Sequence, residues 1–404
     1  MKDRIILHCD CNSFFASVET VLEPKYASVP MAVCGDIERR HGIILAKNEL
    51  AKKYGIETAE TVYSAKKKCP GLVLASPHYD EYVKFSRLAN SIYARYTDMI
   101  ESFGIDESWL DVTASGVFGN GYEIAEKIKA DVKRELGITV SIGVSFNKVF
   151  AKLGSDYKKP DAITVIDRTN YKRIVYPLPV SSLLFVGRKT SESLKAIGIR
   201  TIGDLAGANS EFLIRRFGKS GEMLSKYARA EDDSPVLSHD DSEAKSIGNG
   251  FTFKHDLVGR EECRVGINYL SEEIGSKLRI RGKKCSGVQL SIKDEFLRTI
   301  QRNAQIDPPT DLSSEIADKA FEILCKEWSN ERPVRMITVT ATNLVNAESV
   351  SEQINLFDDG VDEKREKNGK REIAVDKIRE KFGLTSIVKA SIINNDIGIS
   401  KDKR

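Results

Sequence analysis

Two adjacent carboxylates at a bend between short strands most limit how this chain can fold. Residues 103–112 read F-G-I-D-E-S-W-L-D-V, with apolar residues on both sides of Asp106 and Glu107. The alternation predicts one strand entering the bend and another leaving it. Neighbouring carboxylates repel each other and lose hydration when buried, so a cation or hydrogen-bond donors must compensate them. A solvated bend is the alternative explanation for a single Asp-Glu pair.

A third acid ends the first predicted strand. Residues 4–10 read R-I-I-L-H-C-D, a short apolar run that ends on Asp10. If this strand lies beside the bend, three carboxylates from separate strands meet. Two-metal phosphoryl transfer needs this arrangement, because paired cations hold the attacking and leaving oxygens of an in-line displacement.

The segment after Asp10, C-N-S-F-F-A-S-V, predicts a turn into a helix. Asn12 and Ser13 suit helix capping, and free N–H groups at a helix start can bind phosphate. Phe14 and Phe15 are either core aromatics or include a flat ring beneath a nucleotide sugar, where it would exclude a 2′-hydroxyl.

Length and composition limit the class of protein. A chain of 404 residues should form three or four domains. No apolar run of about 18 residues occurs, so we expect no membrane span, no signal peptide and a cytoplasmic location. Seven cysteines without a C-x-x-C pair argue against a disulfide framework and a zinc site.

The first part of the chain predicts an α+β sheet with helices on one face and the carboxylates on its open face. Apolar spacing indicates helices over 80–99 and 122–136, a strand over 138–145 and a further helix before Lys159. Residues 23–76 look like an inserted unit with its own strands and helices and a basic side. A solvated helix face explains most of its lysines, although one could reach a triphosphate.

The later regions predict contacts with nucleic acid. L-L-F-V-G-R-K-T-S-E-S-L-K-A-I-G-I resembles a helix-hairpin-helix, whose turn and lysines, here Gly187 and Lys189, bind DNA phosphate. The usual turn has two glycines, and this one has only Gly187. Residues 277–302 hold eight basic residues against two acids, a footprint for a nucleic-acid backbone or an idle charged surface. Its candidate contacts are Arg279, Arg281 and Lys283.

The last region, residues 346–404, is polar and of mixed charge, and we expect it to begin as a flexible tail. Within it, S-E-Q-I-N-L-F-D-D presents Gln353, Leu356 and Phe357 in a polar context. Such an extended peptide suits docking in an apolar groove of a partner. A later stretch, E-I-A-V-D-K-I-R-E-K-F-G, predicts a short helix.

Taken together, the motifs resemble those of the Y-family translesion DNA polymerases. The motifs are H-C-D-C-N-S-F-F-A-S-V-E, P-K-Y-A-S-V-P-M-A-V-C-G, A-K-N-E-L-A-K-K-Y-G, G-I-D-E-S-W-L-D and S-I-G-V-S-F-N-K-V-F-A-K-L-G-S-D-Y-K-K-P. The resemblance is strong over residues 4–166 and extends to about residue 345. It implies a right-hand polymerase with a palm sheet, small fingers, a helical thumb and a separate α+β little-finger domain. The implied boundaries are palm 1–22 and 77–166, fingers 23–76, thumb 167–232, linker 233–245, little finger 246–345 and tail 346–404.

The resemblance also implies the metal ligands. Asp10, Asp106 and Glu107, together with the main-chain carbonyl of Cys11, match the ligands of two Mg²⁺ ions. Q-I-N-L-F resembles the peptide that binds the bacterial sliding clamp.

The implied nucleotide contacts are Phe15 as steric gate against ribonucleotides, the Phe14 amide, and Lys159 with Lys52 at the triphosphate. Three finger positions depart from the DNA polymerase IV branch, which usually has Thr, Tyr and Arg where this chain has Ala46, Glu49 and Lys52. Asn12 replaces a common Asp. These departures leave the choice between the DNA polymerase IV and UmuC-type branches open.

We therefore predict template-directed DNA synthesis by a low-fidelity polymerase, acting as a monomer on primed template DNA and dNTP and tethered to a sliding clamp. One alternative is a nucleotidyl cyclase or other palm-type nucleotidyltransferase, which also carries acids on such a hairpin. The other is a non-catalytic DNA-binding, clamp-tethered factor.

Overall fold

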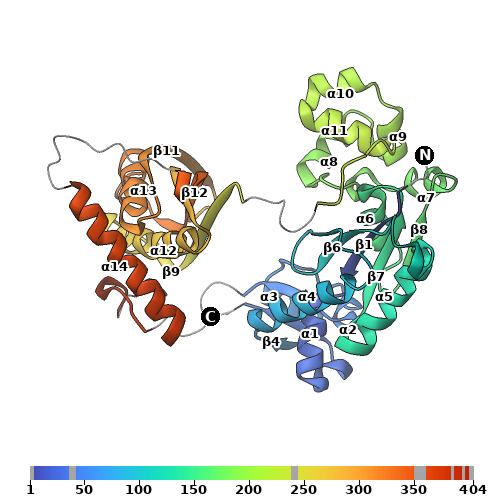
Figure 1. The fold of residues 1–404 in the computed structure, drawn as a ribbon, viewed down its shortest axis with the longest axis horizontal. Coiled ribbons are helices and arrows are strands. Elements are labelled where there is room, and N and C mark those ends of the chain that lie inside the picture. Colours follow the sequence, from blue (N-terminus) through green and yellow to red (C-terminus); the bar gives the residue numbers. More distant parts are fainter. Residues whose placement is uncertain are drawn as a thin grey trace. The chain divides into compact units, whose positions relative to one another are not determined.

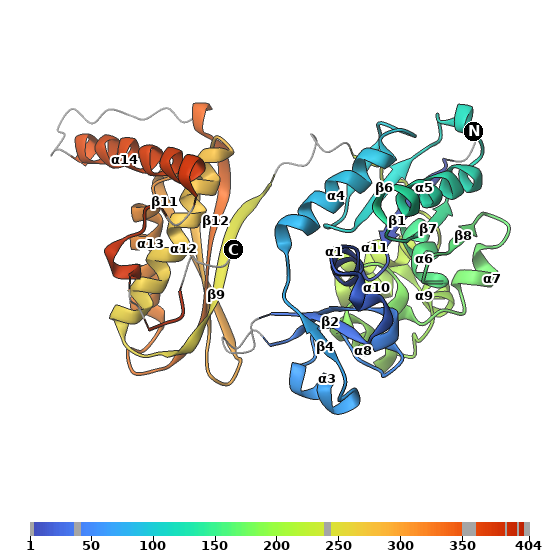
Figure 2. The ribbon, with the colours of Figure 1, turned by 90° about the horizontal axis from the view of Figure 1, so that it is seen from below.

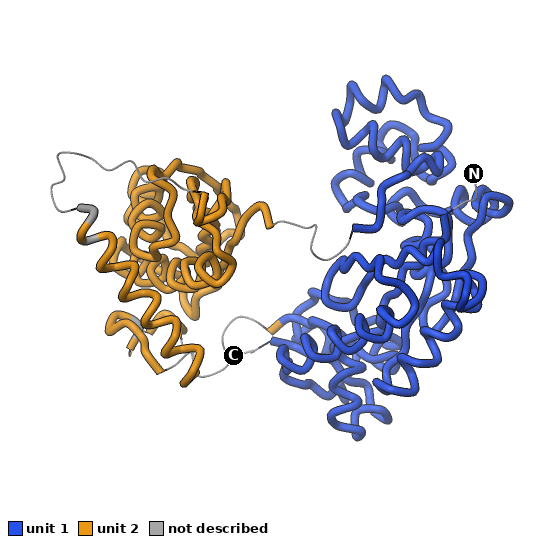
Figure 3. Tube along the Cα trace, in the orientation of Figure 1, with its two compact units in different colours: residues 1–35, 43–242 blue, residues 36–42, 243–404 orange. Residues whose placement is uncertain are grey.

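The computed structural model describes residues 4–35, 42–237, 244–349, 361–383, 386–393 and 396–399. The chain divides into two compact units, residues 1–35 with 43–242 and residues 36–42 with 243–404 (Figure 3). Within the described ranges, no helix has the length and apolar character needed to cross a bilayer.

A five-stranded sheet in the order β5-β6-β1-β7-β8 forms the centre of the first unit (Figure 1). The central strand β1 runs antiparallel to both neighbours, and β7 runs parallel to β8. The strands are β1 Ile6–Cys11, β5 Ile100–Ser102, β6 Glu107–Asp111, β7 Val140–Ser145 and β8 Ile163–Ile166.

Two helices cover one face of this sheet. Because side chains alternate along a strand, Leu7, Cys9 and Cys11 of β1 all point into the core beneath α4 (Tyr79–Tyr93) and α5 (Gly121–Leu136). A capping box starts α5, and Gly137, at φ 69°, ends it. Burial raises the pKa of the Cys11 thiol to about 12, as expected for a packing residue and not a metal ligand.

The other face is partly covered, which corrects the prediction of an open face. Helix α6 (Lys148–Tyr157) packs there, with Ala151 against Ile6. The approach is close because Gly143 of β7 has no side chain, and a Cβ at this position would lie 1.9 Å from the carbonyl oxygen of Ala151. The sequence pattern does not reveal this contact, since it depends on a single glycine.

The predicted inserted unit contains a three-stranded sheet in the order β3-β2-β4. The elements of this unit are η1 Pro24–Ser28, β2 Met31–Cys34, β3 Ile44–Lys47, α2 Glu49–Lys52, α3 Val62–Lys68 and β4 Val73–Ala75. Helix α1 Phe14–Leu22 precedes the unit, and the short turn η2 Gly116–Phe118 lies just before α5. Asn48 caps α2 and also donates to the carbonyls of Tyr26 and Val29, which fixes the start of this helix.

Short helices follow the sheet and enclose an apolar core of their own. They are α7 Tyr171–Val175, η3 Val180–Ser182, α8 Arg188–Ala196, α9 Ile202–Gly207, α10 Ser210–Phe217 and α11 Lys219–Ala228. The first residues of the predicted linker are packed and not free, because Val236 is buried with Ile6, Trp109 and Ala151.

The second unit is a four-stranded antiparallel sheet in the order β11-β10-β12-β9, with α12 and α13 on one face (Figure 2). The elements are β9 Ser246–Leu257, α12 Arg260–Ile280, β10 Lys283–Lys293, β11 Thr299–Thr310, α13 Ser313–Glu327 and β12 Val334–Asn346. Apolar side chains face the helices. The opposite face carries paired polar residues, Gln289 with Asn303 and Thr340, and Ser291 with Gln301 and Thr338.

The chain after β12 includes a long helix that differs from the expected flexible tail. The elements of this last part of the chain are η5 Ala347–Ser349, the long helix α14 Val361–Phe382, and η6 Ala390–Ile392. Arg279 of α12 pairs with Glu372 and Asp376 of α14, both at 2.6 Å, while Ile397 and Ile399 are buried in the core of the unit. Ion pairs between residues far apart in sequence therefore dock this segment, and periodicity alone does not show them.

Candidate active site

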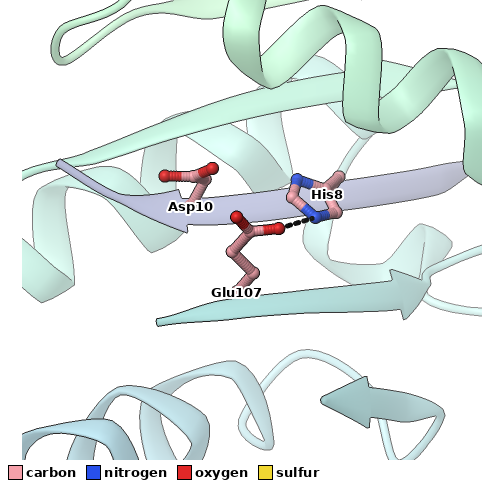
Figure 4. A group of neighbouring side chains, drawn as sticks. All are labelled: His8, Asp10 and Glu107. Carbon is pink, nitrogen blue, oxygen red and sulfur yellow. Dashed lines mark ion pairs between the residues drawn. The ribbon is translucent and has the colours of Figure 1, made fainter. Parts of the chain in front are cut away.

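Asp10 and Glu107 face each other across the sheet. They are register partners of β1 and β6, and Asp10 is only 4% exposed. His8 lies two residues before Asp10, on the same face of β1. One ligand atom from each of His8, Asp10 and Glu107 lies within 4.8 Å of the others (Figure 4). The predicted convergence of Asp10 with Glu107 is therefore present in the structure.

Asp106 lies at the bend immediately before β6. Its carbonyl accepts a hydrogen bond from the amide of Cys11 at 3.0 Å, which ties the bend to the end of β1. Burial, followed by repulsion from Asp10 and Glu107, raises the pKa of the Asp106 carboxyl to about 6. Asp106 is outside the close group of three, but its charge is coupled to both acids.

Two lysines balance these acids. Lys152 Nζ lies 2.9 Å from Asp10 Oδ2 and 3.0 Å from Glu107 Oε2, and Lys159 Nζ lies 2.6 Å from Asp10 Oδ2. Both lysines also pair with Asp156. Burial by itself would lower the pKa of each lysine, but the neighbouring carboxylates, Asp10 foremost, outweigh it and raise the pKa. Both side chains are therefore cations within a cluster of acids.

His8 supports Glu107 from inside the sheet. Its Nδ1 lies 2.8 Å from Ser155 Oγ, and its Nε2 lies 3.3 Å from Glu107 Oε2. Burial lowers the pKa of His8. Burial would raise the pKa of Glu107, but His8 and Lys152 prevail and hold it at about 2. We infer a neutral imidazole beside an ionised carboxylate.

The site has the donors that a divalent cation needs. Carboxylate oxygens are the ligands Mg²⁺ prefers, and oxygens of Asp10 and Glu107 converge here within 4.8 Å of each other. Asp106 adds a third carboxylate at the bend, beside the Cys11 main chain. The residues present therefore fit a metal ion, and Lys152 and Lys159 supply positive charge to the same oxygens.

Phe14 and Phe15 have different surroundings. Phe14 is buried in the core at 3% exposure, whereas Phe15 is half-buried. The ring of Phe15 stacks on Tyr82 of α4, with centroids 4.1 Å apart and planes 11° from parallel. The Tyr82 hydroxyl donates to Glu19, whose carboxylate is buried. Of the two aromatics, Phe15 is thus the one with a ring held in place and partly exposed.

The turn before α1 brings Ser13 into contact with Glu49 of α2. Ser13 has φ 49° and precedes a helix that no side chain caps. Its hydroxyl donates to Glu49 at 3.1 Å, and Lys52 Nζ lies 2.6 Å from the same carboxylate oxygen. The predicted triphosphate residue Lys52 is therefore linked through Glu49 to the start of α1.

The residues predicted to contact DNA differ in their exposure and in their hydrogen bonds within the protein. Gly187 and Lys189 are exposed at the start of α8, and Phe185, at φ 65°, lies just before them in the turn. Arg281 is also exposed, and Lys283 donates to Asn346 at 2.6 Å.

Arg279 has a different role from the predicted one. Only 10% of its side chain is exposed, and its guanidinium forms ion pairs with Glu372 and Asp376 of α14. The basic count over 277–302 overstates the surface charge, because Arg298 and Arg302 also pair with acids, Asp294 and Glu327. The clamp-like peptide with Gln353, Leu356 and Phe357 falls outside the described residues.

The sequence predictions missed several residues of the site. His8 could have been found, because a period of two places it on the same strand face as Asp10. Lys152 lies one helical turn before Asp156, which is a detectable pairing. The contact of Glu19 with Tyr82 has no local signal, because the two residues lie on separate helices.

The fold is that of a Y-family DNA polymerase. A solved Y-family DNA polymerase chimera, Dbh-Dpo4(243-245)-Dbh, aligns with a TM-score of 0.75 at 26% identity, covering 84% of this chain and 99% of the chimera. The impB/mucB/samB family model matches residues 9–156, and the model of its C-terminal domain matches residues 244–356. DNA polymerase IV of Acetivibrio thermocellus is 49% identical over 98% of this chain and 99% of the relative. DNA polymerase IV 1 of Bacillus subtilis is 34% identical over 98% of this chain and 94% of that relative.

The chain belongs to the impB/mucB/samB family of Y-family DNA polymerases. The predicted family and fold class are therefore confirmed. The relatives carry the name DNA polymerase IV, which favours that branch over the UmuC-type branch despite the departures at Ala46, Glu49 and Asn12.

Proposed function

We propose that this chain is a low-fidelity, template-directed DNA polymerase that joins a dNTP to a primer 3′-hydroxyl during damage tolerance. The observation that carries the proposal is the facing pair of Asp10 and Glu107, with Asp106 at the adjacent bend, in a chain that matches proteins named DNA polymerase IV over nearly its whole length. The proposal includes two Mg²⁺ ions held by these acids and by the main-chain carbonyl of Cys11.

The three acids and their neighbours divide the work. Bound Mg²⁺ would lower the charge cost at the attacking and leaving oxygens. Glu107, ionised and supported by His8, keeps a fixed negative charge at the site. Lys159, which reaches Asp10 at 2.6 Å, is placed to contact a phosphate bound beside that acid. Positioning and electrostatics of this kind supply most of the catalysis in phosphoryl transfer.

Sugar selection is assigned to Phe15. Its ring is fixed against Tyr82 by stacking, so it cannot easily turn away from a sugar placed above it. A 2′-hydroxyl there would meet the ring. The amide of Phe14, in the uncapped first turn of α1, is assigned to the triphosphate together with Lys52.

Two surfaces are assigned to the DNA backbone. In the first unit, Gly187 and Lys189 present a turn and a cation at the start of α8. In the second unit, Arg281 and Lys283 remain candidates, and the polar rows of Gln289 and Ser291 offer hydrogen bonds to phosphate. Such contacts hold the duplex without reading its sequence.

We assign binding of a sliding clamp to Gln353, Leu356 and Phe357, which lie between β12 and α14 in the sequence, and we propose that the polymerase acts as a monomer. Leu and Phe in a polar segment have no core of their own, so an apolar groove on a partner is the expected place for them.

Primer extension tests the function. The protein is incubated with Mg²⁺ and labelled dNTP, with and without primed template, on undamaged and abasic templates. We expect template-dependent extension on both and loss of extension in Asp10→Asn and Glu107→Gln. Product formation without DNA would instead identify a cyclase, and unchanged extension in Asp10→Asn would remove the assignment of the acids.

A further inference from the structure

The carboxylate of Glu49 bridges Lys52, which is assigned to the triphosphate, and Ser13, the residue before the assigned amide of Phe14. Its Oε1 accepts a hydrogen bond from the Ser13 hydroxyl at 3.1 Å and pairs with Lys52 Nζ at 2.6 Å. Ser13 lies in the turn before α1, and Glu49 and Lys52 belong to α2. One anionic oxygen therefore joins the start of α1 to a finger lysine.

The position that Glu49 Oε1 occupies is suited to a phosphate oxygen. No side chain caps α1, because the Ser13 hydroxyl is directed to Glu49 and not to the helix N–H groups. The first amides of a helix have no intrahelical acceptor and favour an anion. A hydroxyl, a lysine ammonium and free amides are the donors that bind phosphate oxygens in other sites.

A second lysine adds to the positive potential. Burial lowers the pKa of Lys47, and the nearby Lys52 lowers it further, whereas Glu57, Glu60 and, to a smaller extent, Glu49 raise it. The two ammonium groups thus repel each other, and an anion between the fingers and α1 relieves that repulsion. In this structure the Glu49 carboxylate pairs with Lys52, and Lys47 donates to the Thr58 hydroxyl.

We propose that Glu49 is a built-in competitor for the nucleotide, occupying Lys52 and Ser13 until the phosphates of a dNTP displace its carboxylate. The inference rests on the proposed polymerase function. Binding a triphosphate must break the Glu49 contacts and place the phosphates near the displaced carboxylate. Both effects weaken dNTP binding, so Glu49 raises the KM for dNTP and leaves the chemical step unchanged.

The expected change in the KM for dNTP is modest, because the side chains of Glu49 and Lys52 are 48% and 40% exposed. Exposed ion pairs of this kind change equilibria by roughly two- to fivefold. Screening also weakens such pairs, so the difference should shrink at high ionic strength.

Steady-state single-nucleotide insertion on primed template tests the proposal in Glu49→Gln, Lys52→Ala and the double variant. We expect Glu49→Gln to lower the KM for dNTP roughly two- to fivefold with little change in kcat. Lys52→Ala should raise the KM roughly tenfold, as for loss of a hydrogen bond to a charged group. In the Lys52→Ala background the gain from Glu49→Gln should be smaller, because one of the two contacts has already gone.

The matched control is Glu23→Gln, which removes an exposed acid paired with Lys25 at 2.9 Å in the same unit. Its KM should equal that of the parent. An unchanged or raised KM in Glu49→Gln would overturn the proposal, and a raised KM would show that Glu49 helps to orient Lys52. Absence of any template-dependent insertion by the parent would count against the polymerase function itself, which is a distinguishable result.

Discussion

Replacing Asp106 with Asn should stabilise the fold while abolishing polymerisation. Asp106 is held near Asp10 and Glu107, and the pKa of its carboxyl rises from 3.8 to about 6. A raised pKa in the folded state means that ionising Asp106 costs more in the folded than in the unfolded chain. Asn removes the charge and keeps the shape, so this cost disappears.

The magnitude follows from the pKa. A rise of this size corresponds to about 3 kcal/mol of destabilisation once the group is ionised in both states. The cost is absent below the unfolded pKa of 3.8, grows as the pH rises, and is complete above the folded pKa of about 6. The advantage of Asp106→Asn should therefore reach up to about 3 kcal/mol near pH 7.5, roughly half of that near pH 5, and only about 0.5 kcal/mol near pH 4.

Urea unfolding without divalent ions measures this difference. The chain has two tryptophans, Trp109 in β6 of the first unit and Trp328 in the second, so a Trp328→Phe background reports on the unit that contains Asp106. Asp98→Asn, which alters an exposed acid of the same unit, is the control and should change the free energy of unfolding by less than about 0.5 kcal/mol. Adding Mg²⁺ should stabilise the parent more than Asp106→Asn, because a ligand stabilises only the state that binds it.

Equal stability of the parent and Asp106→Asn near pH 7.5 would refute the claim that burial and repulsion from Asp10 and Glu107 make ionised Asp106 costly in the folded chain. If the gain in the free energy of unfolding of Asp106→Asn did not decrease toward pH 4, the gain would have a cause other than the ionisation of Asp106. Retention of primer extension by Asp106→Asn would remove Asp106 from the catalytic group, whatever its stability.

Three further results are expected. Phe15→Ala should raise the efficiency of ribonucleotide relative to deoxynucleotide insertion roughly 10- to 100-fold, and an unchanged ratio of kcat/KM values would place the steric gate elsewhere. Arg279→Ala should destabilise the second unit by about 3 kcal/mol in urea unfolding, since it removes the ion-pair partner of two partly buried acids of α14. Arg281→Ala should instead weaken DNA binding and lower its salt slope by about 1, and the reverse pattern would contradict the roles given to the two arginines. Deleting Gln353 to Phe357 should abolish clamp binding in a pull-down while leaving extension on short templates intact, whereas retained clamp binding would exclude that peptide.

Local patterns predicted much of the architecture. The helix expected over 122–136 is α5 at Gly121–Leu136, and the expected strand over 138–145 contains β7. Asp10 and Glu107 could be predicted as neighbours because an acid at a strand end needs a compensating group and the two strands were evident. By contrast, the helix α14 was only partly anticipated, since its docking depends on Arg279 meeting Glu372 and Asp376 from a distant part of the chain.

The sequence by itself determined the order of strands and helices, the presence of three acids at strand ends and the family to which these motifs point, because each of these is carried by residues close together in the chain. Only the tertiary structure decided that α6 covers the acidic face through Gly143, that His8 and Lys152 hold Glu107 in its ionised form, and that Arg279 is withdrawn from the surface. These features depend on distances between residues far apart in sequence, and packing and charge pairing set such distances, not local pattern.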